Sequence, residues 1–160
     1  MSRPKSTSHV SPLCNYQSAV DFVKKIQADS KALADQIDVP VEYVVGLAAE
    51  ESQYGSGRIA NTYKNYFSMH APAPFQNGAV PSLNNPKVKV ATYDSFLKCG
   101  QSFVERFGDN VRGIKDPTEF AKALVKVRFN TGDSKTGGRD DFVPYLVQII
   151  KNVKVRMTCN

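Results

Sequence analysis

The sequence predicts a single, mainly helical α+β domain with one small β-lobe. Apolar residues recur at helical spacing over most of the chain, whereas the segment 71–93 is rich in proline and alternates like a strand at 88–93. The 160 residues, of which 41% are hydrophobic and 22% charged, are sufficient for one hydrophobic core. We therefore expect one globular domain at 14–160, preceded by a flexible arm at 1–13 that is rich in Ser, Pro and basic residues.

Capping residues indicate where several helices begin. Asp38 precedes one apolar stripe, Asp94 or Ser95 precedes another, and the pair Asp116-Pro117 precedes a third. The helices are expected within residues 16–37, 39–54, 96–107, 117–127 and 142–155.

The β-lobe is expected at about residues 71–93. Asn77-Gly78 is a typical hairpin turn, and the alternation at 88–93 supplies one strand. The prolines that exclude a helix there are Pro72, Pro74, Pro81 and Pro86.

The formal charge of +6 and the sequence pI near 9.2 favour a polyanionic partner. Nucleic acid and an acidic cell wall are both polyanions, so charge alone does not separate them. No dense Lys/Arg arm or nucleic-acid-binding motif is present, and we expect no nucleic-acid partner. A basic nucleic-acid-binding helical domain remains the alternative that charge supports.

The N-terminal residues lack the apolar run of a secretory signal, and no stretch is long enough to span a membrane. We expect a chain that is made in the cytoplasm and does not insert into membranes. Because the three cysteines have neither CxxC spacing nor histidine companions, we expect no metal site and no cofactor. Cys99 is expected to be buried, and a disulfide between Cys14 and Cys159 is left open. His9 and His70 are interpreted as structural or incidental.

Glu51 is the unusual residue of the second helix. It follows Val44, Leu47 and Ala48 on one helical face, and Tyr54 continues the stripe before glycines end the helix. Burial and the negative end of the helix dipole both raise the pKa of a carboxyl group. A carboxyl group with a raised pKa keeps its proton closer to neutral pH and can act as a general acid. The alternative is a solvated carboxylate at the helix end, and for the neighbouring Glu50 we expect that solvated state.

The stretch Glu51-Ser-Gln-Tyr-Gly-Ser, followed by Asn65-Tyr-Phe-Ser-Met69, resembles the signature of the glycoside hydrolase family 73 glucosaminidases. These lysozyme-like enzymes cut the glycan strands of bacterial peptidoglycan. The family pattern is roughly Ala-Leu-Glu-Ser-Gly-Trp-Gly, then Asn-Asn-Leu-Phe-Gly about ten residues later. The resemblance implies a lysozyme-like fold, in which a helical lobe and the β-hairpin lobe flank a substrate cleft.

The resemblance gives Glu51 the role of catalytic acid. Tyr54 stands at the position of the family's Trp, and Ser68 replaces a Gly of the second block. Thr92-Tyr-Asp-Ser95 is similar to the family's Tyr-Asp/Pro-Ser motif, which lies where the β-lobe ends and the next helix begins. The substrate-binding residues that the resemblance and the aromatic character imply are Tyr54, Asn65, Tyr66, Phe67, Tyr93 and Phe129.

Glycosidases usually use a second carboxylate, whose distance from the acid sets the stereochemistry. No Asp or Glu lies between Glu51 and Asp94, so the β-lobe supplies none. The remaining candidates are Asp94, Asp133, Asp140 and Asp141. Substrate-assisted catalysis or a lytic transglycosylase path would need only one protein acid.

The chain also departs from the family near its C-terminus. The family has a Gly-Tyr-Ala-Thr motif where this chain has Arg128-Phe-Asn-Thr131, so the tyrosine hydroxyl of the motif is absent. A second tyrosine of the family aligns with Phe142. Residues 132–141 are interpreted as an insertion relative to the family. The divergence from the family, the small size, the basic charge and the lack of a secretory signal together suggest a type VI secretion effector. Such an effector would act in the periplasm of a target cell and be blocked by an immunity protein. A phage endolysin, a flagellar wall-penetrating enzyme and an inactive glycan-binding module are the alternatives, as are muramidase and lytic transglycosylase specificity.

Overall fold

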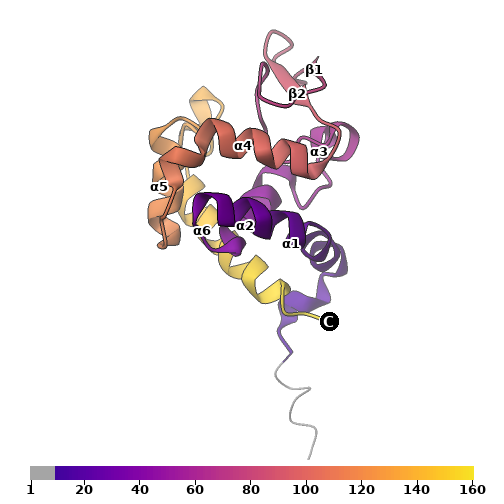
Figure 1. Ribbon diagram of the computed structural model, residues 1–160, viewed down its shortest axis with the longest axis vertical. Helices are drawn as coiled ribbons and strands as arrows, with labels where there is room; N and C mark the ends of the chain where they lie inside the picture. The colour runs from indigo at the N-terminus through magenta and orange to yellow at the C-terminus, as the bar shows by residue number, and fades with distance from the viewer. Residues whose placement is uncertain (1–9) are drawn as a thin grey trace, which may run out of the picture.

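The computed structural model describes residues 10–160 (Figure 1). Of the arm expected at 1–13, residues 1–9, including His9, lie outside the described residues. The mainly helical α+β class is confirmed. The elements are η2 (Pro12–Asn15), α1 (Gln17–Ile37), α2 (Val41–Ser52), α3 (Arg58–Tyr63), β1 (Gly78–Pro81), β2 (Lys89–Thr92), α4 (Phe96–Val111), α5 (Pro117–Lys126), η3 (Ser134–Thr136) and α6 (Phe142–Arg156).

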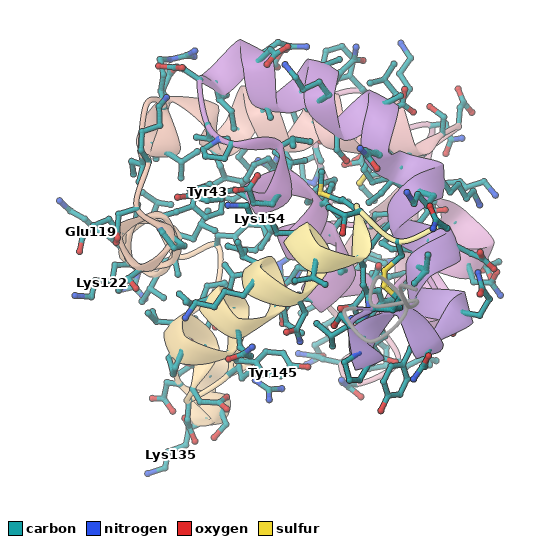
Figure 2. The ribbon with its side chains drawn as sticks, turned by 90° about the horizontal axis from the view of Figure 1, so that it is seen from below. Tyr43, Glu119, Lys122, Lys135, Tyr145 and Lys154 are labelled. Carbon is teal, nitrogen blue, oxygen red and sulfur yellow. A yellow bond between two sulfur atoms is a disulfide. The ribbon has the colours of Figure 1, made fainter. Side chains whose placement is uncertain are left out.

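Helix α2 lies at the centre of the helical lobe, packed between α1 and α6. Every residue from Tyr43 to Ala49 is buried. Gly46 permits the close approach to α6, because a Cβ there would lie 2.7 Å from Ile150 Cγ1. Figure 2 shows Lys154 of α6 beside the start of α2, where its Nζ lies 3.8 Å from Glu42 Oε2. These contacts fix where the C-terminal end of α2 points.

Two of the expected helix starts are confirmed. The Ser95 hydroxyl accepts the Lys98 N–H at 3.1 Å, and the Asp116 carboxylate accepts the Glu119 N–H at 2.9 Å. The expected cap at Asp38 is wrong. Asp38 ends α1 in the left-handed conformation, with φ of 54°, and its carboxylate pairs with Lys115 at 2.8 Å. Pro40 immediately precedes α2 instead.

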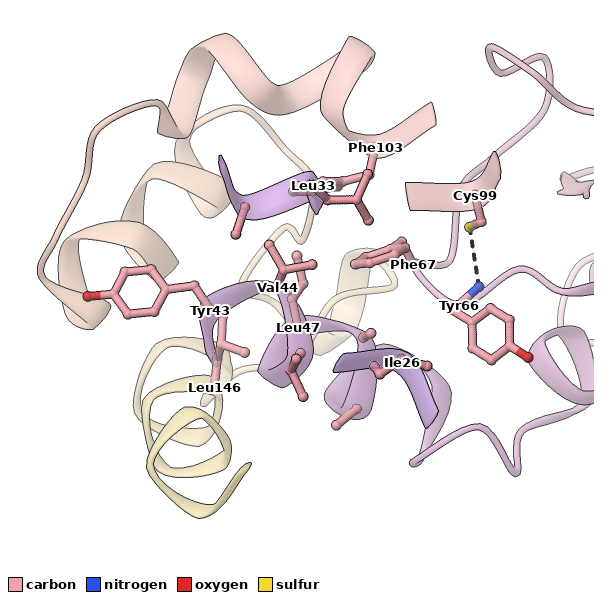
Figure 3. Packing of buried hydrophobic residues seen from close by; sticks show 14 of the residues in the cluster. Ile26, Leu33, Tyr43, Val44, Leu47, Tyr66, Phe67, Cys99, Phe103 and Leu146 are labelled. Carbon is pink, nitrogen blue, oxygen red and sulfur yellow. Dashed lines mark hydrogen bonds between the residues drawn. The ribbon is translucent and has the colours of Figure 1, made fainter. Parts of the chain in front are cut away.

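Aromatic side chains join α4 to the segment that follows α3. Phe67 is fully buried and stacks on Phe103, with ring centroids 5.2 Å apart. Figure 3 shows Phe67 in the centre of the core, close to Leu47 of α2. One residue earlier, the Tyr66 N–H donates to the Cys99 sulfur at 3.3 Å, and burial raises the pKa of this thiol to about 12. The expectation of a buried Cys99 is confirmed.

The β-lobe is a two-stranded antiparallel hairpin at the end of the molecule opposite the C-terminus (Figure 1). Gly78 pairs with Thr92 and Pro81 with Lys89. The expected turn at Asn77-Gly78 is wrong, because Gly78 begins β1 and the strands are connected by residues 82–88. Asn77 has another role, because its N–H donates to the Thr92 carbonyl oxygen at 2.8 Å. This bond holds the two strands together at the end of the hairpin away from the connecting loop.

The two ends of the described chain are joined. Cys14 in η2 and Cys159 after α6 form a disulfide, with Cα atoms 5.7 Å apart. The buried Arg156 guanidinium donates from Nε to the Leu13 carbonyl oxygen at 3.2 Å and stabilises the same junction. Within residues 10–160, no helix combines the length and the hydropathy that crossing a bilayer requires.

Removing the disulfide should destabilise the domain, because the bridge closes a loop of 145 residues in the unfolded chain. The double variant Cys14→Ser, Cys159→Ser should lose about 2–4 kcal/mol of unfolding free energy, as measured by urea denaturation. The wild type with reductant should match the variant, and reductant should not affect the variant. Equal stability of the oxidised and reduced wild type would contradict this prediction.

Candidate active site

Glu51 lies in the last turn of α2 and lines a cavity of about 510 Å³. One wall comes from the hairpin, through residues that include Asn85 and Val88. The facing wall comes from the loop after α5 and includes Arg128 and Phe129. The cavity therefore lies between the hairpin lobe and the helical lobe, with the carboxyl-bearing helix end between its walls.

The turn after Glu51 is held by short hydrogen bonds. The Ser52 hydroxyl donates to the Ala48 carbonyl oxygen at 2.6 Å and accepts the Gly55 N–H at 2.8 Å. Gln53 and Tyr54 both have φ values in the left-handed region, 52° and 54°, although neither is glycine. The chain thus turns away sharply after the carboxyl-bearing residue, which leaves Glu51 facing the cavity.

The segment that follows α3 is fastened by Asn65. Its side-chain Nδ2 donates to the carbonyl oxygens of Met69, at 2.9 Å, and Ala91, at 2.8 Å, and its Oδ1 accepts the Met69 N–H. These bonds connect the segment to strand β2. They also position Ser68, whose hydroxyl donates to the Glu51 carbonyl oxygen at 3.4 Å.

The environment raises the pKa of the Glu51 carboxyl group well above its ordinary value. Desolvation by burial is the largest cause, and the adjacent Glu50 carboxyl group adds to it. The nearby Ser68 hydroxyl acts in the opposite direction and is the smallest of these causes. A carboxyl group in this state keeps its proton closer to neutral pH, as a general acid requires.

The expectation that Glu50 is solvated is wrong. One of its carboxyl oxygens, Oε1, is buried and has no hydrogen-bond partner among residues 10–160. Glu50 as a whole is only partly exposed. The angular spacing on the helix suggested a solvent-facing side chain, but the burial of its carboxyl oxygen depends on a rotamer that spacing does not fix.

No protein-family model and no curated protein matches the chain. Among solved structures, a type VI secretion system effector–immunity complex from Pseudomonas protegens matches with 54% identity and a TM-score of 0.85, over 93% of this chain and 100% of the other. The chain belongs to this effector family.

More distant structures share the fold of the effector. A peptidoglycan hydrolase from Sphingomonas sp. A1 has 21% identity and a TM-score of 0.71, over 88% of this chain and 97% of that one. A C-terminally truncated glycoside hydrolase domain of Salmonella typhimurium FlgJ has 19% identity and a TM-score of 0.63, over 85% of this chain and 97% of that one. The lysozyme-like fold expected from the family 73 signature is confirmed.

Of the six substrate-binding residues expected from the sequence, the structure brings Phe129 into the cavity with Glu51. Phe129 is anchored by edge-to-face contacts with Phe103 and Phe107, at centroid distances of 5.5 and 5.2 Å. Asn65 and Phe67 are buried beneath the cavity, where they support the segment that carries Ser68.

The three tyrosines among these residues are directed elsewhere. The Tyr54 hydroxyl accepts from Arg156 Nη1 at 2.6 Å, and Tyr54 and Tyr66 border a separate depression beside α1. The buried Tyr93 donates to the Ser102 hydroxyl at 2.7 Å, and burial raises the pKa of Tyr93 to about 12. All three rings contribute to packing of the core.

The expected second carboxylates hold loops together. Asp94 Oδ1 accepts from Asn77 Nδ2 at 2.6 Å, Asp133 Oδ1 accepts the Lys135 N–H at 2.9 Å, and Asp141 pairs with Arg139 at 2.7 Å. Asp140 accepts the N–H and the hydroxyl of Ser134, which lowers the pKa of Asp140. Within residues 10–160, the cavity lining contains no carboxylate besides Glu51.

Sequence reasoning missed the basic side of the cavity. His70, interpreted as incidental, lines the cavity together with Arg128. Both also border a smaller adjoining cavity of about 240 Å³ that includes Arg106. Arg106 Nη1 donates to the His70 carbonyl oxygen at 3.2 Å. The position of His70 two residues after Ser68, at the end of the recognised signature, was the available signal.

Proposed function

We propose that this protein is a peptidoglycan glycoside hydrolase that cleaves the β-1,4 glycan backbone of the bacterial cell wall, with Glu51 as the general acid. The observation that carries the proposal is the desolvated Glu51 carboxyl group, which lines a cavity of about 510 Å³. That volume is within the range of small-molecule sites. The shared fold with peptidoglycan hydrolases supports the substrate class.

The Glu51 carboxyl group would donate its proton to the leaving glycosidic oxygen. With no second carboxylate in the cavity lining of residues 10–160, one-acid chemistry fits the site best. Attack by the sugar's own N-acetyl oxygen would suit an N-acetylglucosaminidase, which we favour. A muramidase or lytic transglycosylase would use the same acid. A catalytically inactive glycan-binding module is the alternative function.

We further propose that the protein is an antibacterial effector that acts in the periplasm of a target cell and that an immunity protein blocks its cleft. The relative from the Pseudomonas protegens effector–immunity complex supports this role. The disulfide between Cys14 and Cys159 suits an oxidising compartment such as the periplasm. The net charge of +6 favours an acidic wall as the site of action.

Digestion of purified peptidoglycan tests the hydrolase. Wild-type protein should release soluble fragments, and Glu51→Gln should reduce the rate at least about 100-fold, because the amide cannot supply the proton. Mass spectrometry of borohydride-reduced products identifies the end sugar and hence the bond. Glu119→Gln, on the exposed face of α5, is the matched control and should behave as wild type. Equal digestion by wild type and Glu51→Gln would contradict the proposal, whereas wall pelleting without fragments would favour the binding module.

Directed expression tests the effector role. Wild-type protein exported to the periplasm of a Gram-negative host should cause lysis, because the wall is accessible there. The same chain retained in the cytoplasm should be tolerated, and exported Glu51→Gln should be harmless. Normal growth of cells that export the wild-type protein, at levels confirmed by immunoblot, would contradict the effector role. Equal toxicity of the wild type and Glu51→Gln when both are retained in the cytoplasm would also contradict it.

A further inference from the structure

A smaller cavity of about 240 Å³ adjoins the cavity that contains Glu51. Four residues belong to both linings: Ser68, His70, Arg128 and Phe129. A polymer bound at Glu51 can therefore extend a side group into the smaller cavity. Its volume lies below the range of about 300–1,000 Å³ that is usual for small-molecule sites. The smaller cavity thus suits a short side group better than further sugar rings.

Two arginines make the smaller cavity basic. Arg106 of α4 and Arg128 after α5 reach it from different elements, and its lining contains no Asp or Glu from residues 10–160. Among these residues, no carboxylate forms an ion pair with either arginine. A guanidinium group binds a carboxylate through two parallel N–H bonds, which are charge-assisted and therefore strong. Both guanidinium groups are thus available to an anionic ligand.

Arg106 is held in place by the backbone that precedes the hairpin. Its Nη1 donates to the His70 carbonyl oxygen at 3.2 Å, and its Nη2 donates to the Pro72 carbonyl oxygen. This backbone is itself fixed to β2, because the Ala71 N–H donates to the Lys89 carbonyl oxygen at 3.0 Å. Neutral carbonyl oxygens orient the guanidinium group without cancelling its charge, and the group has further N–H donors for a ligand.

Arg128 has a backbone conformation that glycine usually adopts. Its φ is 63°, in the left-handed region, just beyond the end of α5. Two backbone bonds fix this turn: the Arg128 N–H donates to the Val125 carbonyl oxygen at 3.0 Å, and the Phe129 N–H donates to the Leu124 carbonyl oxygen at 2.9 Å. Strained positions of this kind gather at functional sites. The turn places the Arg128 side chain in the lining of both cavities.

The rest of the lining is largely apolar. It consists of Met69, Phe107, Val127 and Phe129, besides Ser68 and the basic residues. Met69 is buried, and the rings of Phe107 and Phe129 meet edge to face at 5.2 Å, so these side chains are packed in place. An apolar surface beside two guanidinium groups favours an organic carboxylate with alkyl groups over a fully hydrated inorganic anion.

We propose that the smaller cavity is a subsite for the peptide stem of peptidoglycan, in which Arg106 and Arg128 bind a carboxylate of the stem. The stem is a short peptide on alternate sugars of the glycan backbone, and it carries both methyl groups and free carboxylates. This inference rests on the proposed function for the identity of the polymer. It makes the protein selective for glycan strands that bear peptides.

Binding of two soluble peptidoglycan tetrasaccharides tests the subsite without catalysis. One tetrasaccharide retains its stems, whereas an amidase has removed them from the other and left free lactyl carboxylates. In calorimetric titrations, Glu51→Gln should bind the stem-bearing form at least about tenfold more tightly, as a charge-assisted contact predicts. Adding Arg128→Asn should remove most of this preference, because Asn tolerates the left-handed conformation but carries no charge. Arg128→Lys should retain more of it.

Arg58→Gln is the matched control, because it removes an exposed guanidinium group outside both cavities and should leave the preference unchanged. Equal binding of the two tetrasaccharides, binding of neither, or an unchanged preference in folded Arg128→Asn would overturn the proposal. If wild type releases no fragments from peptidoglycan, the hydrolase fails while this titration still decides the subsite. If wild type digests the wall but the preference is absent, the subsite alone fails.

Discussion

The enclosure of α2 is the constraint on which the rest of the structure depends. Its buried run from Tyr43 to Ala49 is packed between α1 and α6, and Gly46 allows α6 to approach so closely that an added Cβ would collide with Ile150. The hydrophobic energy of this packing keeps the last turn of the helix in place. Glu51 on that turn is only partly exposed where it lines the cavity, and desolvation raises the pKa of its carboxyl group.

Polar contacts then build a cavity around the enclosed carboxyl group. Asn65 joins the segment after α3 to strand β2, which places Ser68 and the hairpin on one side. Phe129 anchors the facing loop through its contacts with Phe103 and Phe107. His70 and the Arg128 guanidinium line the same space. The site thus combines an acid of raised pKa with a basic border, an arrangement suited to a carboxylate-rich glycan polymer.

The sequence predicted the fold well where local rules decide it. Stripes at helical spacing located the helices, the caps at Ser95 and Asp116 were found, and Glu51 was recognised because its position conflicts with an apolar stripe. The roles of Tyr54 and Tyr66 were harder to predict. An aromatic residue near a site can contact either the substrate or the core, and only three-dimensional packing decides which. The burial of a Glu50 carboxyl oxygen likewise depends on a side-chain rotamer, and the gathering of His70 and Arg128 depends on contacts between distant segments.

The ionisation of Glu51 itself tests this account most directly. Carbon NMR of protein labelled at the glutamate carboxyl groups, titrated from acid to alkaline pH, follows each group separately, and Glu51→Gln assigns the Glu51 signal. The account predicts that this signal titrates at a pH well above the ordinary glutamate value of about 4.3. A Glu51 signal that titrates at the ordinary glutamate value would contradict the account.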